Sequence, residues 1–381
     1  MSTAPVAGPH DDLTDVAGVR VGHHQRIGRG WRTGTTVVLL PPGSVGGVDV
    51  RGGGPCTRET DALAPGTLVE VVHAVCLSGG SVFGLAAASG VTDWLAGRGV
   101  GLPVGPGLGE VAPIVPAACL FDLRPGAWTH RPDAAFGRAA ADAAAGAGGS
   151  GPVRLGSVGA GAGARSGPLA GGVGSASAVL AASPDDAAIA GSGREASPEG
   201  VTVAALVVVN SAGSPVDEAS GRLYGADLLL AGEAADLRSP VSSEPAVPLP
   251  AWGSPDRPDR TATVLVVVAT DAALGPAECT RVAMAAHDGL ARAFRPAHGL
   301  TDGDVVFAVA TGGRPPAAGV PAPGGLLRAG AAGSAGLGEV MAAAADVVTR
   351  GCVRAVLAAG GGDHPSYRDR YPGACGVAPA R

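Results

Sequence analysis

A threonine at the start of an apolar run is the residue with the clearest chemical potential in this chain. Thr263 opens the segment TVLVVVA, and such an unbroken apolar run is typical of a β-strand buried on both faces. The small residue Ala262 precedes it, behind a proline-rich, polar stretch over residues 237–260. A hydroxyl in this place could attack the peptide bond before it, and the amine freed by that cut could then act as its base. The simpler interpretation is that threonine is a good strand former, and the segment alone does not exclude it.

Three further polar residues lie at the ends of apolar runs. Asn210 ends the run VTVAALVVVN, while Asp302 and Asp304 come just before the run VVFAVA. If the strand that ends at Asn210 is antiparallel to the other two, all of these groups meet Thr263 at one edge of a sheet. They would then supply a nucleophile, an oxyanion donor and an acid, which is the minimum set for acyl transfer. The alternative is that Asn and Asp end these strands because they favour turns.

The elements expected to position these groups are buried strands and amphipathic or Ala-rich helices. The pattern predicts strands over 35–40, 68–77, 201–209, 263–269 and 305–310, and helices over 81–97, 133–145, 276–294 and 335–349. Strands that are apolar on both faces need helices on each side. The expected fold class is therefore a layered α/β sandwich, with the Gly-rich stretch over 156–177 as a loop lined by backbone and the polar stretch over 182–200 as an exposed loop.

Other motifs give weaker indications of chemistry. Ser81 lies between a predicted strand and a predicted helix, as the nucleophile does in some hydrolases, but it lacks the G-x-S-x-G spacing. The stretch GAGGSG over 146–151 matches a dinucleotide-binding pattern, but it follows a helical run instead of a strand. The eight histidines form no spaced ligand set, so we expect neither a metal nor another cofactor.

Composition limits the partners that the chain could have. The formal net charge is −6, and all 27 residues counted as Lys or Arg are arginines scattered along the chain. Nucleic acid is therefore not an expected partner. The six cysteines form no CxxC pair, and there is neither a secretory signal nor an apolar run long enough to cross a membrane. We expect a cytoplasmic protein that acts on a small molecule.

Eight collinear segments between residues 13 and 312 form a pattern more specific than any single motif, and the resemblance that they carry covers the chain from about residue 12 to 360. They are LTDVAGVRVGHH, VGGVDVRGGGPCTRETDAL, VHAVCLSGGSVFGLAAASGV, PIVPAACLFDL, VVVNSAGSP, VVVATDAAL, AMAAHDGLARAFRP and DGDVVFAVATG. Together they resemble the L-aminopeptidase/D-esterase family, which includes β-aminopeptidases and nylon-oligomer hydrolases. The resemblance implies a four-layer αββα sandwich of the N-terminal-nucleophile hydrolase type. It further implies an enzyme that hydrolyses amide or ester bonds of small peptides or amino acid derivatives, and that assembles as a tetramer of processed units.

The resemblance also implies where the chain cuts itself. The family's nucleophile lies eight residues before the Asp of an ATD motif, which is Asp271 here, so it corresponds to Thr263 and not to Thr261. A single hydrolase domain, residues 1–381, would be cut after Ala262 into an α chain (1–262) and a β chain (263–381). By the same correspondence Asn210 is the oxyanion donor, and Asp302 and Asp304 are the acidic pair.

The chain departs from the family's pattern at two places. The residue before the cut is often Asn or Gly in the family and is Ala262 here, whose small side chain should still allow the cut. The nylon-hydrolase branch has a lysine near the site, whereas this chain has Pro168 at the matching position and no lysine anywhere. Arg165 is a candidate to supply a cation there, although arginine cannot accept a proton, and Phe121 is a candidate for the wall of the substrate pocket. A small-molecule binder or scaffold that keeps the fold without processing remains the alternative.

Overall fold

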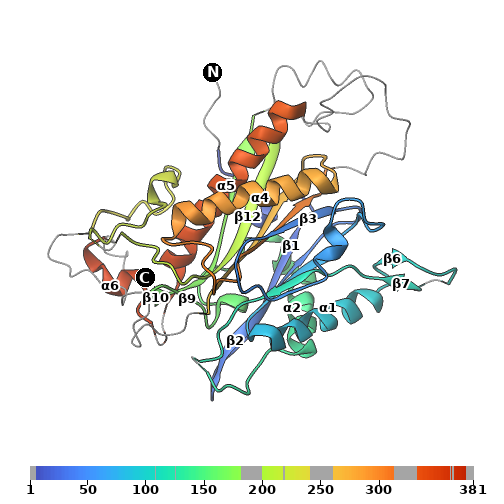
Figure 1. Cartoon of the computed structure of the whole chain (residues 1–381), viewed down its shortest axis with the longest axis horizontal. Coiled ribbons are helices and arrows are strands. Elements are labelled where there is room, and N and C mark those ends of the chain that lie inside the picture. The colour runs from blue at the N-terminus through green and yellow to red at the C-terminus, as the bar shows by residue number, and fades with distance from the viewer. Residues whose placement is uncertain are drawn as a thin grey trace.

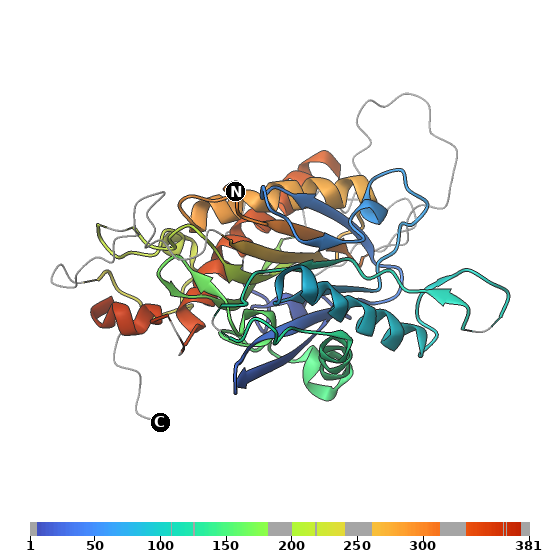
Figure 2. The same cartoon turned by 60° about the horizontal axis from the view of Figure 1, so that its bottom comes forward.

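The chain folds into two stacked β-sheets, each covered on its outer face by helices (Figure 1). The computed structural model describes residues 6–107, 109–124, 126–181, 200–217, 219–240, 261–312, 333–360, 362 and 364–374. The predicted loop over 182–200 lies almost wholly outside these residues, as does most of the proline-rich stretch before Thr263. Figure 2 shows the four layers from another side, and their order αββα confirms the expected fold class.

The first sheet carries the predicted site. Its order is β11 (Gly172–Leu180), β12 (Val201–Asn210), β13 (Thr263–Thr270), β14 (Val305–Ala310) and β3 (Val45–Val50). Strand β12 runs antiparallel to β13, and β13 runs parallel to β14. The end of β12 and the beginnings of β13 and β14 therefore lie at the same edge of the sheet. This is the arrangement that the convergence of Asn210, Thr263 and Asp304 requires.

The second sheet and the helices complete the layers. The sheet has the order β1 (Arg20–Gly28), β2 (Trp31–Leu39), β5 (Ala74–Ser78), β8 (Ala117–Cys119) and β4 (Thr57–Arg58), and two short hairpins consist of β6 (Leu102–Pro103) with β7 (Val111–Ala112) and β9 (Arg165–Ser166) with β10 (Leu169–Ala170). Helices α4 (Pro276–Ala293) and α5 (Gly333–Ala358) pack on the first sheet, while α1 (Ala86–Ala96) and α2 (Ala134–Ala145) pack on the second. The short helix α6 (Tyr367–Arg370) follows α5. None of the helices in the described part of the chain is long and apolar enough to span a membrane.

The core between the two sheets holds the predicted site strands in place. Leu77 and Ala118 of the second sheet pack there against Leu206, Leu265 and Phe307 of the first, and all five are buried. The outer face of the first sheet packs against α4 and α5 in a separate cluster. Strands β12 and β13 are thus buried on both faces, which explains why their sequences read as continuous apolar runs.

The sequence-based prediction was wrong over two segments. The strand predicted over 68–77 begins only at Ala74, and Leu68 is 93% exposed. The stretch 156–177, predicted to be a loop, contains the beginning of β11. Its glycines are needed because α5 lies very close: a Cβ on Gly174 would lie 1.9 Å from the carbonyl oxygen of Gly351. Small residues that indicate a loop by composition here allow a helix to pack directly on a strand.

Candidate active site

The peptide bond between Ala262 and Thr263 lies at the edge where the three strands meet. Both residues are buried, and Thr263 pairs with Asn210 across the sheet. The Thr263 hydroxyl donates a hydrogen bond of 2.6 Å to the carbonyl oxygen of Ala262. The backbone N–H of Gly303 donates to the same oxygen at 2.8 Å. Two donors thus converge on this carbonyl, and one of them is the hydroxyl that could attack it.

Glycine at position 303 leaves the space in which the Thr263 hydroxyl lies. A Cβ at this position would be 2.6 Å from Thr263 Oγ1 and 2.8 Å from the carbonyl oxygen of Gly54. The segment around Gly54 is in turn fixed to the same turn, because its N–H donates to the Asp302 carbonyl at 2.8 Å. Any side chain at 303 would therefore displace either the hydroxyl or this segment.

The two acids predicted as a pair have different surroundings. Asp304 Oδ1 accepts from the N–H of Val264 at 2.8 Å, directly beside Thr263. Its Oδ2 accepts from the backbone N–H of His298 at 3.2 Å and lies 2.8 Å from His298 Nδ1. Asp302 Oδ2 instead accepts from the N–H of Gly299 at 2.7 Å. Asp304 is thus directed at the beginning of β13, while Asp302 braces the turn that carries both acids.

Asn210 is buried on the other side of Thr263, and its amide is held by main-chain groups. Its Oδ1 accepts from the N–H of Arg165 at 3.1 Å, and its Nδ2 donates to the Phe121 carbonyl at 3.2 Å. The two residues predicted as substrate contacts therefore adjoin Asn210 through their backbones. The Phe121 ring lies 6.1 Å from the ring of Trp128, which is 53% exposed. Since an amide nitrogen carries two hydrogens, Asn210 keeps one for a further acceptor.

Neither Asp271 nor Ser81, which the sequence also singles out, is hydrogen-bonded to Thr263 among the described residues. Asp271, the landmark for the nucleophile, follows the opposite end of β13 and accepts from the N–H of Thr202 at 2.8 Å. Burial raises the pKa of Asp271 above its usual value. Ser81 begins the 3₁₀ helix η3 (Ser81–Leu85), and among the described residues no histidine is hydrogen-bonded to its side chain. The described geometry thus gives Ser81 no base.

Sequence reasoning missed His298 and Gly303. Gly303 was visible only as the spacer between two acids, and nothing in its neighbourhood distinguishes His298 from the other histidines. The tight turn before β14 brings His298 back onto Asp304. His287, by contrast, is a buried core histidine whose Nε2 lies 3.1 Å from the Asp49 carbonyl oxygen.

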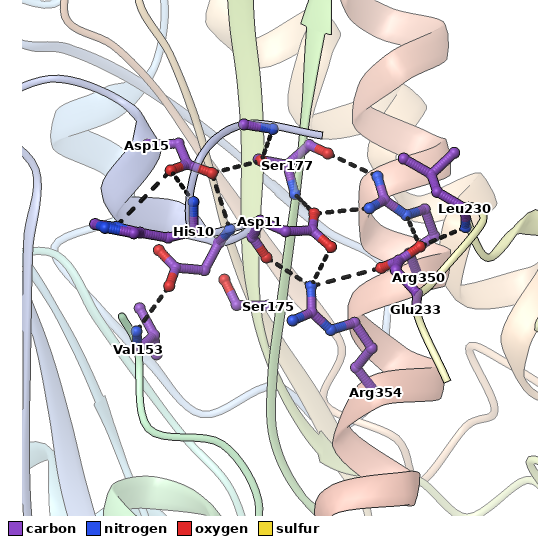
Figure 3. Close-up of polar contacts among 12 residues, drawn as sticks. His10, Asp11, Asp15, Val153, Ser175, Ser177, Leu230, Glu233, Arg350 and Arg354 are labelled. Carbon is purple, nitrogen blue, oxygen red and sulfur yellow. Dashed lines mark hydrogen bonds and ion pairs between the residues drawn. The ribbon is translucent and has the colours of Figure 1, made fainter. Parts of the chain in front are cut away.

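A second polar cluster lies towards the other end of the first sheet (Figure 3). Arg350 of α5 contacts Asp11 at 2.7 Å and Glu233 at 2.8 Å, and Arg354 contacts Asp11 at 2.7 Å. Arg350 also donates to the carbonyl of Ser177, which pairs with Ala204, six residues before Asn210 on β12. Burial and a hydrogen bond with Glu233 raise the pKa of Asp11 to about 6. This cluster ties the beginning of the chain and the segment around Glu233 to α5.

A sequence profile of peptidase family S58 matches residues 11–365. The chain belongs to this family. A protein of Mycobacterium tuberculosis named as an uncharacterized aminopeptidase is 47% identical over 386 residues, which cover 96% of this chain and 99% of that protein. A 6-aminohexanoate-oligomer endohydrolase of Kocuria sp. is 30% identical over 302 residues, covering 78% of this chain and 74% of that protein. The resemblance seen in the sequence is thereby confirmed, and S58 membership makes the chain a peptide hydrolase.

Solved structures agree with the observed fold. A β-aminopeptidase from Burkholderia sp. superposes with a TM-score of 0.66 at 25% identity, covering 97% of this chain and 93% of that one. The L-aminopeptidase D-Ala-esterase/amidase from Ochrobactrum anthropi superposes with a TM-score of 0.67 at 24% identity, covering 94% and 88%. The latter is described as a variant of the N-terminal-nucleophile hydrolase fold. The present chain therefore has this fold.

Proposed function

We propose that this peptidase is a self-processing aminopeptidase or amidohydrolase whose nucleophile is Thr263, made N-terminal by a cut after Ala262. One observation carries the proposal. The carbonyl oxygen of Ala262 accepts hydrogen bonds from the Thr263 hydroxyl at 2.6 Å and from the Gly303 N–H at 2.8 Å. Attack needs a hydroxyl beside a carbonyl and a donor for the charge that develops on its oxygen, and both are present.

The first stage is the self-cleavage. Thr263 Oγ1 forms a bond to the Ala262 carbonyl carbon, the negative charge that develops on its oxygen is stabilised by the Gly303 N–H, and the C–N bond breaks as the nitrogen takes up the hydroxyl proton. The result is an ester between Ala262 and Thr263, which water hydrolyses to release a carboxylate and regenerate the hydroxyl. Gly303 is needed twice, for its N–H and for the space that its missing side chain leaves.

The second stage is the hydrolysis of a substrate. The free α-amine of Thr263 would titrate at about 7.7–8.0, so that near neutral pH it accepts the hydroxyl proton as the hydroxyl attacks. The second amide hydrogen of Asn210 would bind the substrate oxyanion. Asp304, already hydrogen-bonded to the next N–H along the strand, would stabilise the amine once it carries a proton. The cut and the hydrolysis thus use different oxyanion donors, Gly303 and Asn210.

The substrates proposed for this mechanism are small peptides and amides or esters of amino acids. Phe121 and Arg165, which adjoin Asn210, would contribute to the walls of the pocket. The mechanism needs no cofactor. Assembly as a tetramer of processed units in the cytoplasm is part of the same proposal.

The proposal is tested by intact-mass measurement and N-terminal sequencing of the purified protein. We expect two chains, residues 1–262 and 263–381, with the smaller one beginning at Thr263. Thr263→Ala should give one uncut chain without hydrolase activity, because it has no nucleophile. Thr263→Ser keeps the oxygen and should still be cut. Thr261→Ala is the matched control: this threonine lies two residues away, and its loss should leave the cut unchanged.

Three outcomes would overturn the proposal. A wild-type enzyme that hydrolyses peptides as a single uncut chain would exclude the self-processing mechanism. An uncut chain without activity on any such substrate would instead favour the non-processing relative. Loss of activity in Ser81→Ala, with Thr263→Ala still active, would move the nucleophile to Ser81.

A further inference from the structure

His298 accounts for both contacts to one oxygen of Asp304. Oδ2 accepts from the His298 backbone N–H at 3.2 Å and lies 2.8 Å from its ring Nδ1, while Val264 holds Oδ1 at 2.8 Å. When the carboxylate is ionised it only accepts hydrogen bonds, and Nδ1 is then the donor. The carboxylate is therefore fixed at both oxygens, and rotation about its last bond would break contacts on both sides.

The backbone of His298 adopts a conformation that is unusual for its side chain. Its φ is +57°, in the left-handed region that non-glycine residues enter at a cost of roughly 1–2 kcal/mol. In this conformation its own N–H and its ring reach the same carboxylate oxygen. Strain of this kind persists only where the surrounding structure enforces it, and it gathers at functional sites.

The His298 ring packs against a second histidine. The His287 ring packs edge-on against it with 4.8 Å between centroids. His287 is buried and is anchored through Nε2 to the Asp49 carbonyl oxygen on β3. A continuous chain of contacts thus runs from β3 through two imidazoles to Asp304 and on to Val264, the residue after the proposed nucleophile.

We propose that His298 is a positioning residue for the reaction at Thr263. It holds Asp304 aligned with the beginning of β13, so that the carboxylate meets the α-amine when the cut frees it. The proposal rests on the proposed function, since it assigns a role only if Thr263 is the nucleophile. His298 touches neither the carbonyl of Ala262 nor the hydroxyl in the described contacts, so it acts through Asp304.

The left-handed backbone supplies a matched pair of variants. His298→Asn keeps a side-chain N–H that can donate to Asp304, and asparagine tolerates this conformation better than most residues. His298→Gly tolerates it fully but has no donor. The two variants therefore differ mainly in the hydrogen bond. Melting temperatures, measured in a Thr263→Ala background where all chains are uncut, report separately what each substitution does to the fold.

The experiment compares the rate of self-cleavage and then kcat and KM on an amino acid amide for wild type, His298→Asn and His298→Gly. We expect His298→Gly to lower kcat by on the order of 10- to 100-fold with little change in KM, and His298→Asn to recover most of that loss. The rate of the cut should change little in either variant, because Asp304 acts on the amine that the cut frees. Equal kcat values in wild type and His298→Gly would overturn the proposal while leaving the proposed function intact. Equal losses in both variants would also overturn it, since the donor would then not matter. A wild type that is neither cut nor active would overturn the proposed function and this role together.

Discussion

Two buried polar clusters lie towards opposite ends of the first sheet, and they differ in what neutralises their carboxylates. At the edge of Thr263, Asp304 is held by two backbone N–H groups and one imidazole. At the other end, Asp11 and Glu233 are paired with the guanidinium groups of α5. The first arrangement orients a carboxylate with hydrogen bonds, and the second binds its carboxylates to permanent cations.

The difference is consistent with the proposed reaction at Thr263. An arginine-paired carboxylate already has a counter-ion, because guanidinium stays protonated at any relevant pH. Within the described residues no arginine pairs with Asp304, so its charge remains available for a cation that arises during the reaction. The ammonium of a freed Thr263 would be that cation. The arginine cluster holds distant segments together, and the Thr263 edge is suited to catalysis.

The largest effect on activity is expected from removing the charge of Asp304. Asp304→Asn keeps the size of the side chain but presents an N–H to donors on one side and cannot balance an ammonium. We expect kcat to fall on the order of 10²- to 10⁴-fold, measured by amide hydrolysis, because Asp304 acts on the amine that the cut frees. Asp302→Asn is the control. Its kcat should fall less, since Asp302 braces its own turn. A wild-type kcat in Asp304→Asn would refute the role of the charge.

Much of the Thr263 edge could be predicted before the structure, because strand ends carry their own signals. Long apolar runs define β12, β13 and β14, and a polar residue marks the end of each that lies at the site. Only the relative direction of the strands had to be assumed, and the structure confirms it. Strand β11 was not predicted, because the small residues that admit α5 have the same composition as a loop.

The remaining parts of the site could not be predicted because they depend on turns and on backbone atoms. The N–H of Gly303 carries no sequence signal, and His298 reaches Asp304 only through a left-handed residue in a tight turn. The arginine cluster joins residues as far apart as Asp11 and Arg354 through contacts that no local pattern encodes. A sequence indicates which side chains end strands, but not which loops fold back on them.

The second prediction concerns the arginine cluster. Arg350→Met should destabilise the protein by about 3–5 kcal/mol, because it removes the buried cation that contacts both Asp11 and Glu233 and leaves only the more exposed Arg354 beside them. It should leave the chemistry at Thr263 intact. Urea denaturation of the uncut Thr263→Ala protein, with and without this change, measures the loss. Arg354→Met is the matched control. The Arg354 side chain is 21% exposed and that of Arg350 is 3% exposed, so the free energy of unfolding should fall by roughly 1 kcal/mol or less in Arg354→Met. A slowed cut in Arg350→Met at temperatures where it is folded would contradict the separation of the two clusters.

The buried carboxyl of Asp122 gives a third case, in which no cation from the described part of the chain is paired with the carboxyl group. Asp122 follows Phe121, and its Oδ1 accepts from the N–H of Gly80 at 2.7 Å. No basic side chain is paired with it among the described residues. Burial raises the pKa of Asp122 from 3.8 to about 7, because the interactions with the Thr33 hydroxyl and the Gly80 N–H only partly offset the lost hydration.

The pH dependence of this third case gives the smallest expected effect. Because the folded pKa is above the unfolded one, the stability that Asp122 contributes is complete below about pH 4 and is lost as the pH rises to about 7. Asn does not titrate. The stability of Asp122→Asn relative to the protein with Asp122 should therefore rise between about pH 4 and pH 7, by at most about 4 kcal/mol, and level off at higher pH. Urea denaturation of both proteins in the Thr263→Ala background between pH 4 and 8.5 measures the difference. A difference that does not change with pH would mean that Asp122 is ionised in the folded protein at little cost. Hydrogen-bond donors alone would then stabilise the buried Asp122 carboxylate as well as arginine stabilises the carboxylates of Asp11 and Glu233.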